Sequence, residues 1–407
     1  MAGSSYHFQG HGSRRKRSRY AIRLVVLLLI AFAAGGFCIY AVKTANPKTI
    51  ATSTRGIVST HNVTANVVGK YLFSGTIMLG RAVATYANGN YSQPFSGMAS
   101  LGSYDAHIGV FECPITTNNV SYQTEVNDLV FNCSPNWVPT LRKYFPILNL
   151  SSDHLNDQGP QGITDTFQYL HAAGIQTVGT YNPHTQKDQC TVIVMPINVT
   201  ESDGKSTSAS LPIAMCSYNY KILYGPAPGE LANINKWSKI LPVIALMNGG
   251  PEYEHTAGTA QVSVAHQMID EGADFVVGNG THWVQNTEVY KNKLIVYSMG
   301  NFIFDQTDND GRVALNLSVG MNLADTSNVQ KWLQIGASCK AQPSTCNARV
   351  TSAKLAKFTP HYSFSVVGSY GGYLQVATKA TPQEESYIEQ RANWASTNSK
   401  LSEESSY

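Results

Sequence analysis

The chain has 407 residues, a formal net charge of +3 and only 14% charged residues. Its length allows one decorated α/β domain or two domains. Six cations lie together near the N-terminus, at Arg14, Arg15, Lys16, Arg17, Arg19 and Arg23. Subtracting these six from +3 leaves about −3 for the rest of the chain, so the composition gives no basic surface for nucleic acid.

An uncharged apolar segment, residues 24–42, directly follows the basic cluster. As a helix it would span the ~30 Å hydrocarbon core of a membrane. Because cations precede it and few follow, it predicts a single-pass cell-membrane protein with a cytoplasmic N-terminus and an extracytoplasmic main domain. Two alternatives are a buried core helix and a signal peptide cleaved after the small-x-small pattern at 31–33. The long basic leader favours a retained anchor.

This interpretation divides the chain into segments. Residues 1–23 form a basic cytoplasmic leader and 24–42 the transmembrane anchor. Residues 43–70 are rich in small polar residues, which is typical of a stalk. The main domain is expected over 71–380, and the polar tail 381–407 is expected as a surface helix or a disordered end.

Seven cysteines occur, of which Cys38 lies in the apolar segment. The other six are on the predicted exported side, at Cys113, Cys133, Cys190, Cys216, Cys339 and Cys346. An even number in an oxidising compartment predicts disulfides, for which fifteen connectivities exist. We expect pairing between chain neighbours. A zinc cluster is the alternative, but no C-x₂-C spacing occurs.

Buried strands and helices alternate along the main domain. Strands are predicted at 71–79, 106–111, 145–150, 175–178, 191–197, 211–215, 241–247, 274–278 and within 293–304, and helices at 163–173 and 260–271. This alternation is typical of the α/β class. In such sheets the chemistry gathers on loops at the strand ends.

Polar clusters follow five of the predicted strands. They are Gly75-Thr76, Glu112, Asp153-His154 with Asp157, Asn248 with Glu252, and Asn279 to His282. Carboxylate, imidazole and amide oxygen are the ligands expected for a divalent metal. Two metals bridged by a carboxylate would activate a water for attack on phosphorus or a carbonyl.

Six ordered motifs contain these clusters: GTIMLGR (75–81), VFECP (110–114), SDHLNDQG (152–159), NGGPEY (248–253), ADFVVGNGTHWVQ (273–285) and YSMGNF (297–302). In their order and residue pattern they resemble the CapA family, the poly-γ-glutamate capsule-synthesis proteins, whose domain is similar to calcineurin-like metallophosphoesterases. The resemblance covers roughly residues 71–320. It implies an α/β sandwich of two sheets flanked by helices.

The chain departs from the family pattern at several ligand positions. Thr76 stands where the family has a metal-binding aspartate, Asn248 replaces a histidine, and Asn279 and Gly280 replace an adjacent histidine pair. Val110 replaces an asparagine, and Ser152 and Asp153 replace two more. The ligand-type residues that remain are Glu112, His154 and His282, with Asp153 and Asn248 as weaker donors. The resemblance therefore implies one divalent metal (Mn, Fe or Zn) or none, rather than two.

Four residues of the motifs are candidates for substrate binding: Arg81, Asp157, Glu252 and Asn301. Structural roles compete with the functional ones. Glu112 could pair with Arg81, His154 could brace its own loop, and Asn301 could satisfy loop backbone.

The resemblance implies a membrane-attached participant in capsule or exopolymer production, with the polymer and membrane synthase subunits as partners. One mechanism is a metal-dependent hydrolase or transferase acting on a phosphoester or amide, with metal on Glu112, His154 and His282. The other is a non-catalytic module that guides polymer or contacts the synthase. The incomplete ligand set favours the second. An adhesin-like or receptor role is a third alternative.

Overall fold

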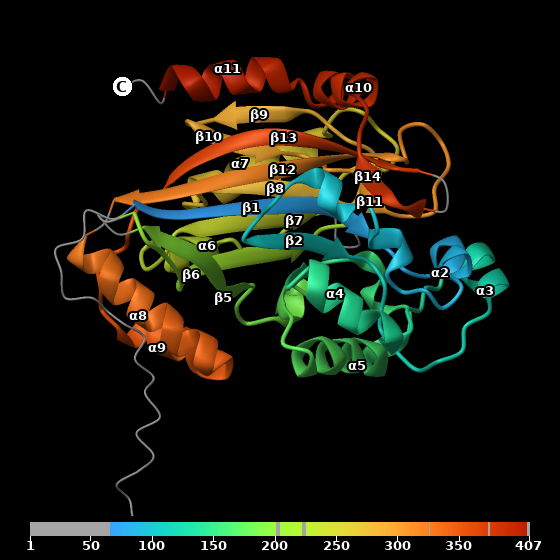
Figure 1. Ribbon diagram of the computed structural model, residues 1–407, viewed down its shortest axis with the longest axis horizontal. Helices are drawn as coiled ribbons and strands as arrows, with labels where there is room; N and C mark the ends of the chain where they lie inside the picture. Colours follow the sequence, from blue (N-terminus) through green and yellow to red (C-terminus); the bar gives the residue numbers. More distant parts are fainter. Residues whose placement is uncertain (1–65, 201–203, 222–224, 325, 373–374, 405–407) are drawn as a thin grey trace, which may run out of the picture. The chain divides into compact units, whose positions relative to one another are not determined.

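The computed structural model describes residues 66–404 except 201–203, 222–224, 325 and 373–374. The predicted leader, the anchor at 24–42, Cys38 and most of the stalk lie outside the described residues. Within the described ranges, no helix is both long enough and apolar enough to cross a membrane. The described part is a mixed sheet with helices against it, which confirms the α/β class (Figure 1).

The strands are β1 (Asn66–Ile77), β2 (Ala106–Phe111), β3 (Ile147–Asn149), β4 (Gln176–Val178), β5 (Cys190–Thr200), β6 (Ser206–Asn219), β7 (Val243–Asn248), β8 (Phe275–Asn279), β9 (Thr287–Tyr290), β10 (Lys293–Val296), β11 (Asn301–Ile303), β12 (Val313–Ala324), β13 (His361–Gly371) and β14 (Ala377–Lys379). The α-helices are α2 (Arg81–Ala87), α3 (Tyr122–Asn127), α4 (Val138–Tyr144), α5 (Gly159–Ala172), α6 (Ala232–Ser238), α7 (Thr259–Asp270), α8 (Ser327–Ala341), α9 (Cys346–Ser352), α10 (Pro382–Ala392) and α11 (Trp394–Glu404). Short 3₁₀ helices are η1 (Gln93–Phe95), η2 (Met98–Leu101), η3 (Pro135–Trp137), η4 (Asp153–Asn156), η5 (Pro183–Thr185) and η6 (Pro343–Thr345).

Strand β1 joins two halves of the sheet. Its first residues pair antiparallel with β12 on one side and β5 on the other. Its second half pairs parallel with β2 and β11 instead. One path therefore runs β14-β13-β12-β1-β5-β6-β7-β8-β10-β9, and β2-β3-β4 branches from β1. The family resemblance implied two sheets, whereas β1 links all fourteen strands into one hydrogen-bonded network.

Two apolar cores lie on the two faces of this branch. One contains Phe73 of β1, Ile108 of β2 and Phe275 of β8, and the rings of Phe73 and Phe275 meet edge to face at 5.9 Å. The other contains Leu72 and Phe111 with residues of α4 and α5. Adjacent residues of a strand point to opposite faces, so Leu72 and Phe73 enter different cores. Figure 1 shows α10 and α11 over β9 and β13, and α8 beside β5 and β6.

The predicted strands were found, and several are longer than their apolar runs. Strand β6 reaches from Ser206 to Asn219, beyond the predicted 211–215, because its exposed first residues continue the pairing with β5 and its buried last residues continue the pairing with β7. Helix α7 agrees with the predicted 260–271 to within one residue at each end. From Pro382 the chain forms α10 and α11, with Ile388 and Trp394 buried.

The six cysteines of the main domain form three disulfides between chain neighbours, as predicted: Cys113–Cys133, Cys190–Cys216 and Cys339–Cys346. Cys190 and Cys216 lie directly opposite each other on β5 and β6. Cys113 follows Glu112, so its bond to Cys133 anchors the loop after β2. The zinc alternative is wrong, because all six thiols are consumed.

Candidate functional site

The polar clusters meet where parallel strands end. Residues Asn219, Asn248 and Asn279 are the last residues of β6, β7 and β8, and they are register partners across these strands. On the other half of the sheet, Thr76 of β1 is the register partner of Val110, two residues before Glu112. Because the carboxyl ends of parallel strands share one edge, the loops that follow them converge.

Glu112 lies at the centre of this edge. The residue is 2% exposed, and its Oε2 atom has no hydrogen-bond partner among the described residues. Burial raises the pKa of the carboxyl above its ordinary value. Charges on His282 and His154 oppose this rise, and the charge on Asp153 adds to it. These three predicted residues are therefore electrostatic neighbours of Glu112, as the clustering of strand-end loops predicts.

His154 is held on three sides. The Nδ1 atom donates to Asp157 Oδ2 at 2.8 Å, and the ring stacks on Phe131 with centroids 3.9 Å apart. Its Nε2 atom lies 4.0 Å from Asp153 Oδ2. Burial alone would lower the pKa of His154, but the hydrogen bond to Asp157 and the charges on Glu112 and Asp153 outweigh it and raise the pKa to about 9. At neutral pH this imidazole is a cation.

His282 is fixed by a ring of contacts. Asn301 Nδ2 donates to Gln306 Oε1 at 2.8 Å. The other amide atom of Asn301, Oδ1, therefore accepts from His282 Nδ1 at 3.1 Å. Gln306 Nε2 donates to the Tyr253 hydroxyl at 2.9 Å, and the Tyr253 ring stacks on His282. This leaves His282 Nε2 facing Glu252, whose Oε1 is 3.9 Å away. The contacts of Asn301 are therefore structural, because Asn301 sets the orientation of the His282 ring.

Amides and a hydroxyl occupy the positions at which the family pattern has other ligands. Asn279 Nδ2 donates to Thr76 Oγ1 at 2.5 Å. Asn248 Nδ2 approaches Asn219 Oδ1 at 3.3 Å and Asp153 Oδ1 at 3.5 Å. Across the part of the chain that the structure describes, the Oδ1 atoms of Asn248 and Asn279 have no donor. These side chains mostly bond to one another.

The donors at this edge fit a divalent metal only in part. In favour, the buried Oε2 of Glu112 lacks a partner and His282 presents Nε2. Against it, no group of three His, Cys, Asp or Glu side chains in the described ranges could hold a metal ion. The described side chains thus supply single donor atoms, including the amide oxygens of Asn248 and Asn279, rather than a cluster of acidic and imidazole ligands.

Arg81 does not pair with Glu112. Its Nη2 atom donates to Asp305 Oδ1 at 2.5 Å, and its guanidinium lies over the ring of Phe131, 4.6 Å from the centroid. The alternative that Glu112 pairs with Arg81 is therefore wrong. Phe131 stacks on His154 as well, so one aromatic ring separates Arg81 from the His154 imidazole. Asp157 binds His154 and the backbone N–H of Phe131, which makes it a bracing residue here.

Lys221 belongs to the site and was missed from the sequence. Its Nζ lies 2.7 Å from Glu252 Oε1 and 3.0 Å from the Gly280 carbonyl oxygen. The signal was available, because Lys221 follows an apolar strand as the other site residues do. The predicted strand ends at residue 215, whereas β6 continues to Asn219, so the sequence pattern does not place Lys221 at a strand end.

Three residues of the site have left-handed backbone conformations: Arg81 (φ 45°), Tyr253 (φ 58°) and His282 (φ 65°). For residues with a side chain this conformation costs about 1–2 kcal/mol. Such residues gather at functional sites, where the surrounding contacts hold them in place. Here the ring of contacts through Asn301 and Gln306 supplies that support for Tyr253 and His282.

Known proteins resemble this chain over the same segment. A family model described as bacterial capsule synthesis protein PGA_cap matches residues 70–306. A capsule biosynthesis protein CapA of Bacillus anthracis is 28% identical over 243 residues, which are 57% of this chain and 59% of the relative. A PGA biosynthesis protein CapA of Bacillus subtilis (strain 168) is 27% identical over 254 residues, 58% of this chain and 63% of the relative.

A more distant relative is a probable polyglutamine synthesis accessory protein of Mycobacterium tuberculosis, 25% identical over 189 residues, which are 43% of this chain and 50% of the relative. The chain thus spans less than two thirds of the length of these relatives. A solved protein of Thermus thermophilus aligns with 73% of the chain and 98% of its own length at 10% identity, with a TM-score of 0.34, too low to support an argument. Because the family model covers more than half of the chain, this protein belongs to the bacterial capsule synthesis family PGA_cap.

Proposed function

We propose that this protein is a membrane-anchored, extracytoplasmic accessory protein in the synthesis of a poly-glutamate-like surface polymer. The printed names of its relatives support the polymer class. The apolar segment 24–42 after a basic leader supports the anchor, with synthase subunits in the same membrane as partners. The two halves of the sheet, with one core between them, support a calcineurin-like arrangement.

The site acts in this proposal by binding polymer rather than by two-metal chemistry. The observation that carries this is the hydrogen bonding of Asn279 to Thr76 and of Asn248 to Asn219. The side chains of Thr76, Asn248 and Asn279 bond to neighbouring side chains at the positions where the resemblance implies carboxylate and imidazole ligands. Hydroxyls and amides suit hydrogen bonding to a polymer backbone better than tight binding of Mn, Fe or Zn.

A metal-dependent hydrolase of the surface polymer is the second candidate. The observation in its favour is the Oε2 atom of Glu112, unpartnered among the described residues, together with the Nε2 atom that His282 presents. Glu112 and His282 would hold the ion, with His154 joining after loss of its proton. A bound ion would polarise the amide carbonyl or phosphoryl group of the polymer.

Gene deletion and complementation test the proposed function. Deleting the gene should abolish surface polymer that yields glutamate on acid hydrolysis, and the full chain should restore it. A Glu112→Gln variant should restore less than a tenth of the wild-type amount of polymer. Glu254 is an exposed neighbour, and Glu254→Gln should restore the full amount. Because the substitution removes a buried carboxyl, Glu112→Gln should be at least as stable as the wild type, which separates lost function from misfolding. Unchanged polymer in the deletion strain would contradict the proposal.

Metal content separates the two mechanisms. The purified full chain and a His154→Ala, His282→Ala double variant are compared by elemental analysis. Stoichiometric Mn, Fe or Zn that is lost in the variant would support the hydrolase. Absence of metal from a wild-type protein that still binds polymer would support the binding module.

A further inference from the structure

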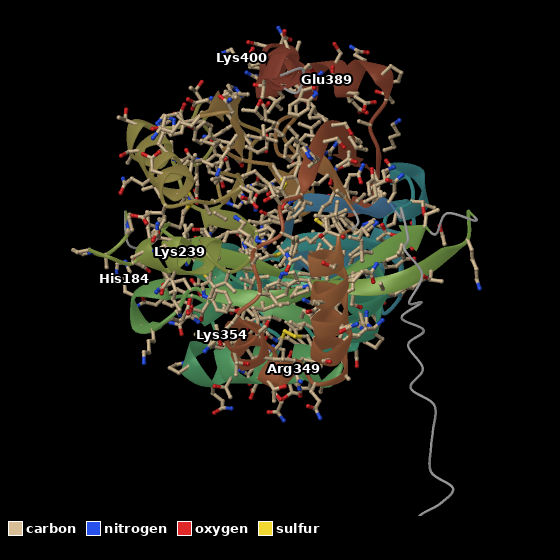
Figure 2. The ribbon with its side chains drawn as sticks, turned by 90° about the vertical axis from the view of Figure 1, so that its left-hand side faces the viewer. His184, Lys239, Arg349, Lys354, Glu389 and Lys400 are labelled. Atoms are coloured by element: carbon tan, nitrogen blue, oxygen red, sulfur yellow. A yellow bond between two sulfur atoms is a disulfide. The ribbon has the colours of Figure 1, made fainter. Side chains whose placement is uncertain are left out.

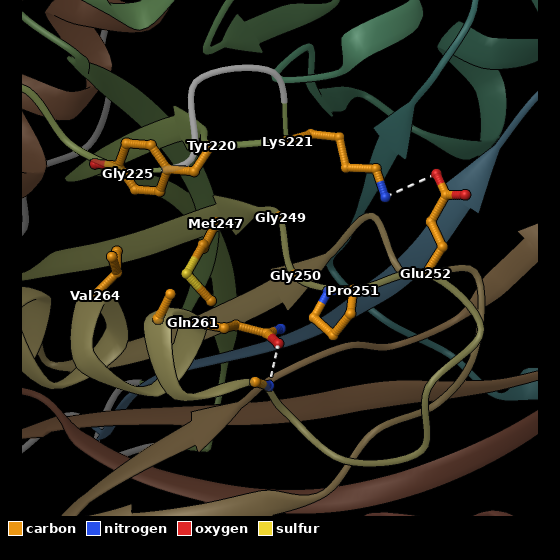
Figure 3. Close-up of a pocket in the computed structure, with 12 residues that line it drawn as sticks. Tyr220, Lys221, Gly225, Met247, Gly249, Gly250, Pro251, Glu252, Gln261 and Val264 are labelled. Carbon is orange, nitrogen blue, oxygen red and sulfur yellow. Dashed lines mark hydrogen bonds and ion pairs between the residues drawn. The ribbon is translucent and has the colours of Figure 1, made fainter.

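A pocket of about 510 Å³ lies beside the Glu112 centre, a volume typical of ligand sites (Figure 3). Its walls come from the ends of β6 and β7, the loop 249–252 and the first half of α7. Much of the lining is apolar, contributed by Met247, Pro251, Ala260 and Val264. Of the substrate-binding candidates predicted from the sequence, Glu252 lines this pocket.

The pocket has a charged end and a second polar group. Among the residues that line it, Lys221 is the one cation and Glu252 the one anion, and they pair at 2.7 Å. The Tyr220 hydroxyl lies at the other side of the view in Figure 3, away from this pair. Tyr220 is 6% exposed, and its hydroxyl has no partner among the described residues. Apolar side chains lie between the two polar groups (Figure 3).

Glu252 lies within reach of two side chains, Lys221 and His282. Its Oε1 atom lies 2.7 Å from Lys221 Nζ and 3.9 Å from His282 Nε2. Burial alone would raise the pKa of Glu252, but the hydrogen bond and charge of Lys221 lower it, so the carboxylate is ionised at neutral pH. A ligand carboxylate arriving at Lys221 would displace Glu252 toward His282. Glu252 therefore borders both the pocket and the residues around Glu112.

We propose that the pocket binds a glutamyl segment of the polymer, with one carboxylate on Lys221 in place of Glu252. The methylene groups of the segment would pack against Met247 and Val264, and its next carbonyl would accept from the Tyr220 hydroxyl. A glutamyl unit has two polar groups separated by methylenes, which matches the order of polar and apolar groups in the lining. This inference rests on the proposed function and names the part of the polymer that is recognised.

Two charge variants give opposite expectations. Binding of a γ-linked glutamyl trimer to the full chain in detergent is measured by calorimetry. Lys221→Gln should weaken binding about tenfold, because a charge-assisted hydrogen bond is lost. Glu252→Gln should strengthen binding severalfold, because it removes the competing carboxylate. A purely structural ion pair would weaken binding in both variants, so that result would overturn the proposal.

A steric variant tests the location independently of charge. Ala260 lines the pocket and is exposed on α7, so Ala260→Trp should fill the pocket and abolish trimer binding without disturbing the core. Gln267→Trp on the exposed part of the same helix is the matched control and should bind like the wild type. Equal binding by Ala260→Trp and wild type would overturn the proposal.

The ligand class is tested with a γ-linked glutaminyl trimer, in which amides replace the side carboxylates. It should bind at least tenfold more weakly than the glutamyl trimer, and equal binding would overturn the carboxylate assignment. The pocket assignment can fail while the proposed polymer binding holds. In that case the wild type would bind long poly-glutamate, and the Ala260→Trp variant would bind it equally well. If the wild type binds neither trimer nor polymer, the proposed polymer binding fails as well.

Discussion

At the scale of single residues, the candidate site is a buried carboxyl between two differently held imidazoles. Glu112 lacks a hydrogen-bond partner at Oε2 among the described residues. His154 is charged and braced by Asp157, whereas His282 donates from Nδ1 to Asn301 and leaves Nε2 open. Two histidines with different second partners can therefore take different roles toward one ligand.

The raised pKa of His154 predicts a pH-dependent stability. The pKa is about 9 in the folded protein and about 6.5 in an unfolded chain. Below pH 6.5 both states bind the proton and the stabilisation is fully present. As the pH rises toward 9 the unfolded state loses the proton first, so the free energy of unfolding should fall, by at most about 1.4 kcal/mol per pH unit.

Denaturant unfolding at several pH values between 6 and 9.5 measures this slope. His154→Gln should remove most of it, and His361→Gln, an exposed histidine on β13, should leave it unchanged. A slope that is equal in His154→Gln and wild type would show that other groups cause the pH dependence.

At the scale of elements, β1 determines where the site forms. It changes partners along its length, from β12 and β5 to β2 and β11. The change opens the sheet into two halves, whose strand ends then face each other across Asn279 and Thr76. The disulfide Cys113–Cys133 anchors the loop after β2. Elements after the matched family segment, from β12 onward, complete the core.

Helix α10 should contribute to stability through one apolar side chain. Ile388 is fully buried, and α10 packs on β13, where Gly368 leaves room for it. Ile388→Ala should lower the free energy of unfolding by about 2–5 kcal/mol. Glu389, the next residue, points outward at the surface (Figure 2). Glu389→Ala should therefore change stability by less than about 0.5 kcal/mol. Thermal unfolding of both variants checks the difference, and equal losses would show that α10 is not part of the cooperative fold.

At the scale of the whole molecule, a membrane anchor would place the site near the synthase. The segment 24–42 is the basis for this, and the domain after it holds three disulfides, which form in oxidising compartments. Restriction to a membrane surface raises the effective concentration of a weak binding module near its partner. Such a module needs no high affinity for single polymer units.

Cell fractionation tests the anchor. The full chain should remain in the membrane fraction after an alkaline wash, and protease added to intact cells lacking an outer barrier should reach the domain after residue 43. A variant without residues 24–42 should not associate with the membrane. A soluble mature protein that begins near Ala34 would show a cleaved signal peptide instead.

The sequence by itself determined the α/β class, the alternation of elements and the family, and it predicted a disulfide pairing that the structure confirmed. Each depends on local patterns: apolar runs define strands, chain neighbours form the disulfides, and the motifs follow strand ends. It also predicted that the loops with Glu112, His154 and His282 converge, because parallel strands end at one edge.

Only the tertiary structure decided which side chains bond to which. Arg81 pairs with Asp305, 224 positions away, and Lys221 pairs with Glu252 on a different loop. The row of Asn219, Asn248 and Asn279 depends on strand register, and the pocket on the position of α7 beside the ends of β6 and β7. Such contacts follow from strand order and side-chain direction, which the pattern of residues along the chain does not encode locally.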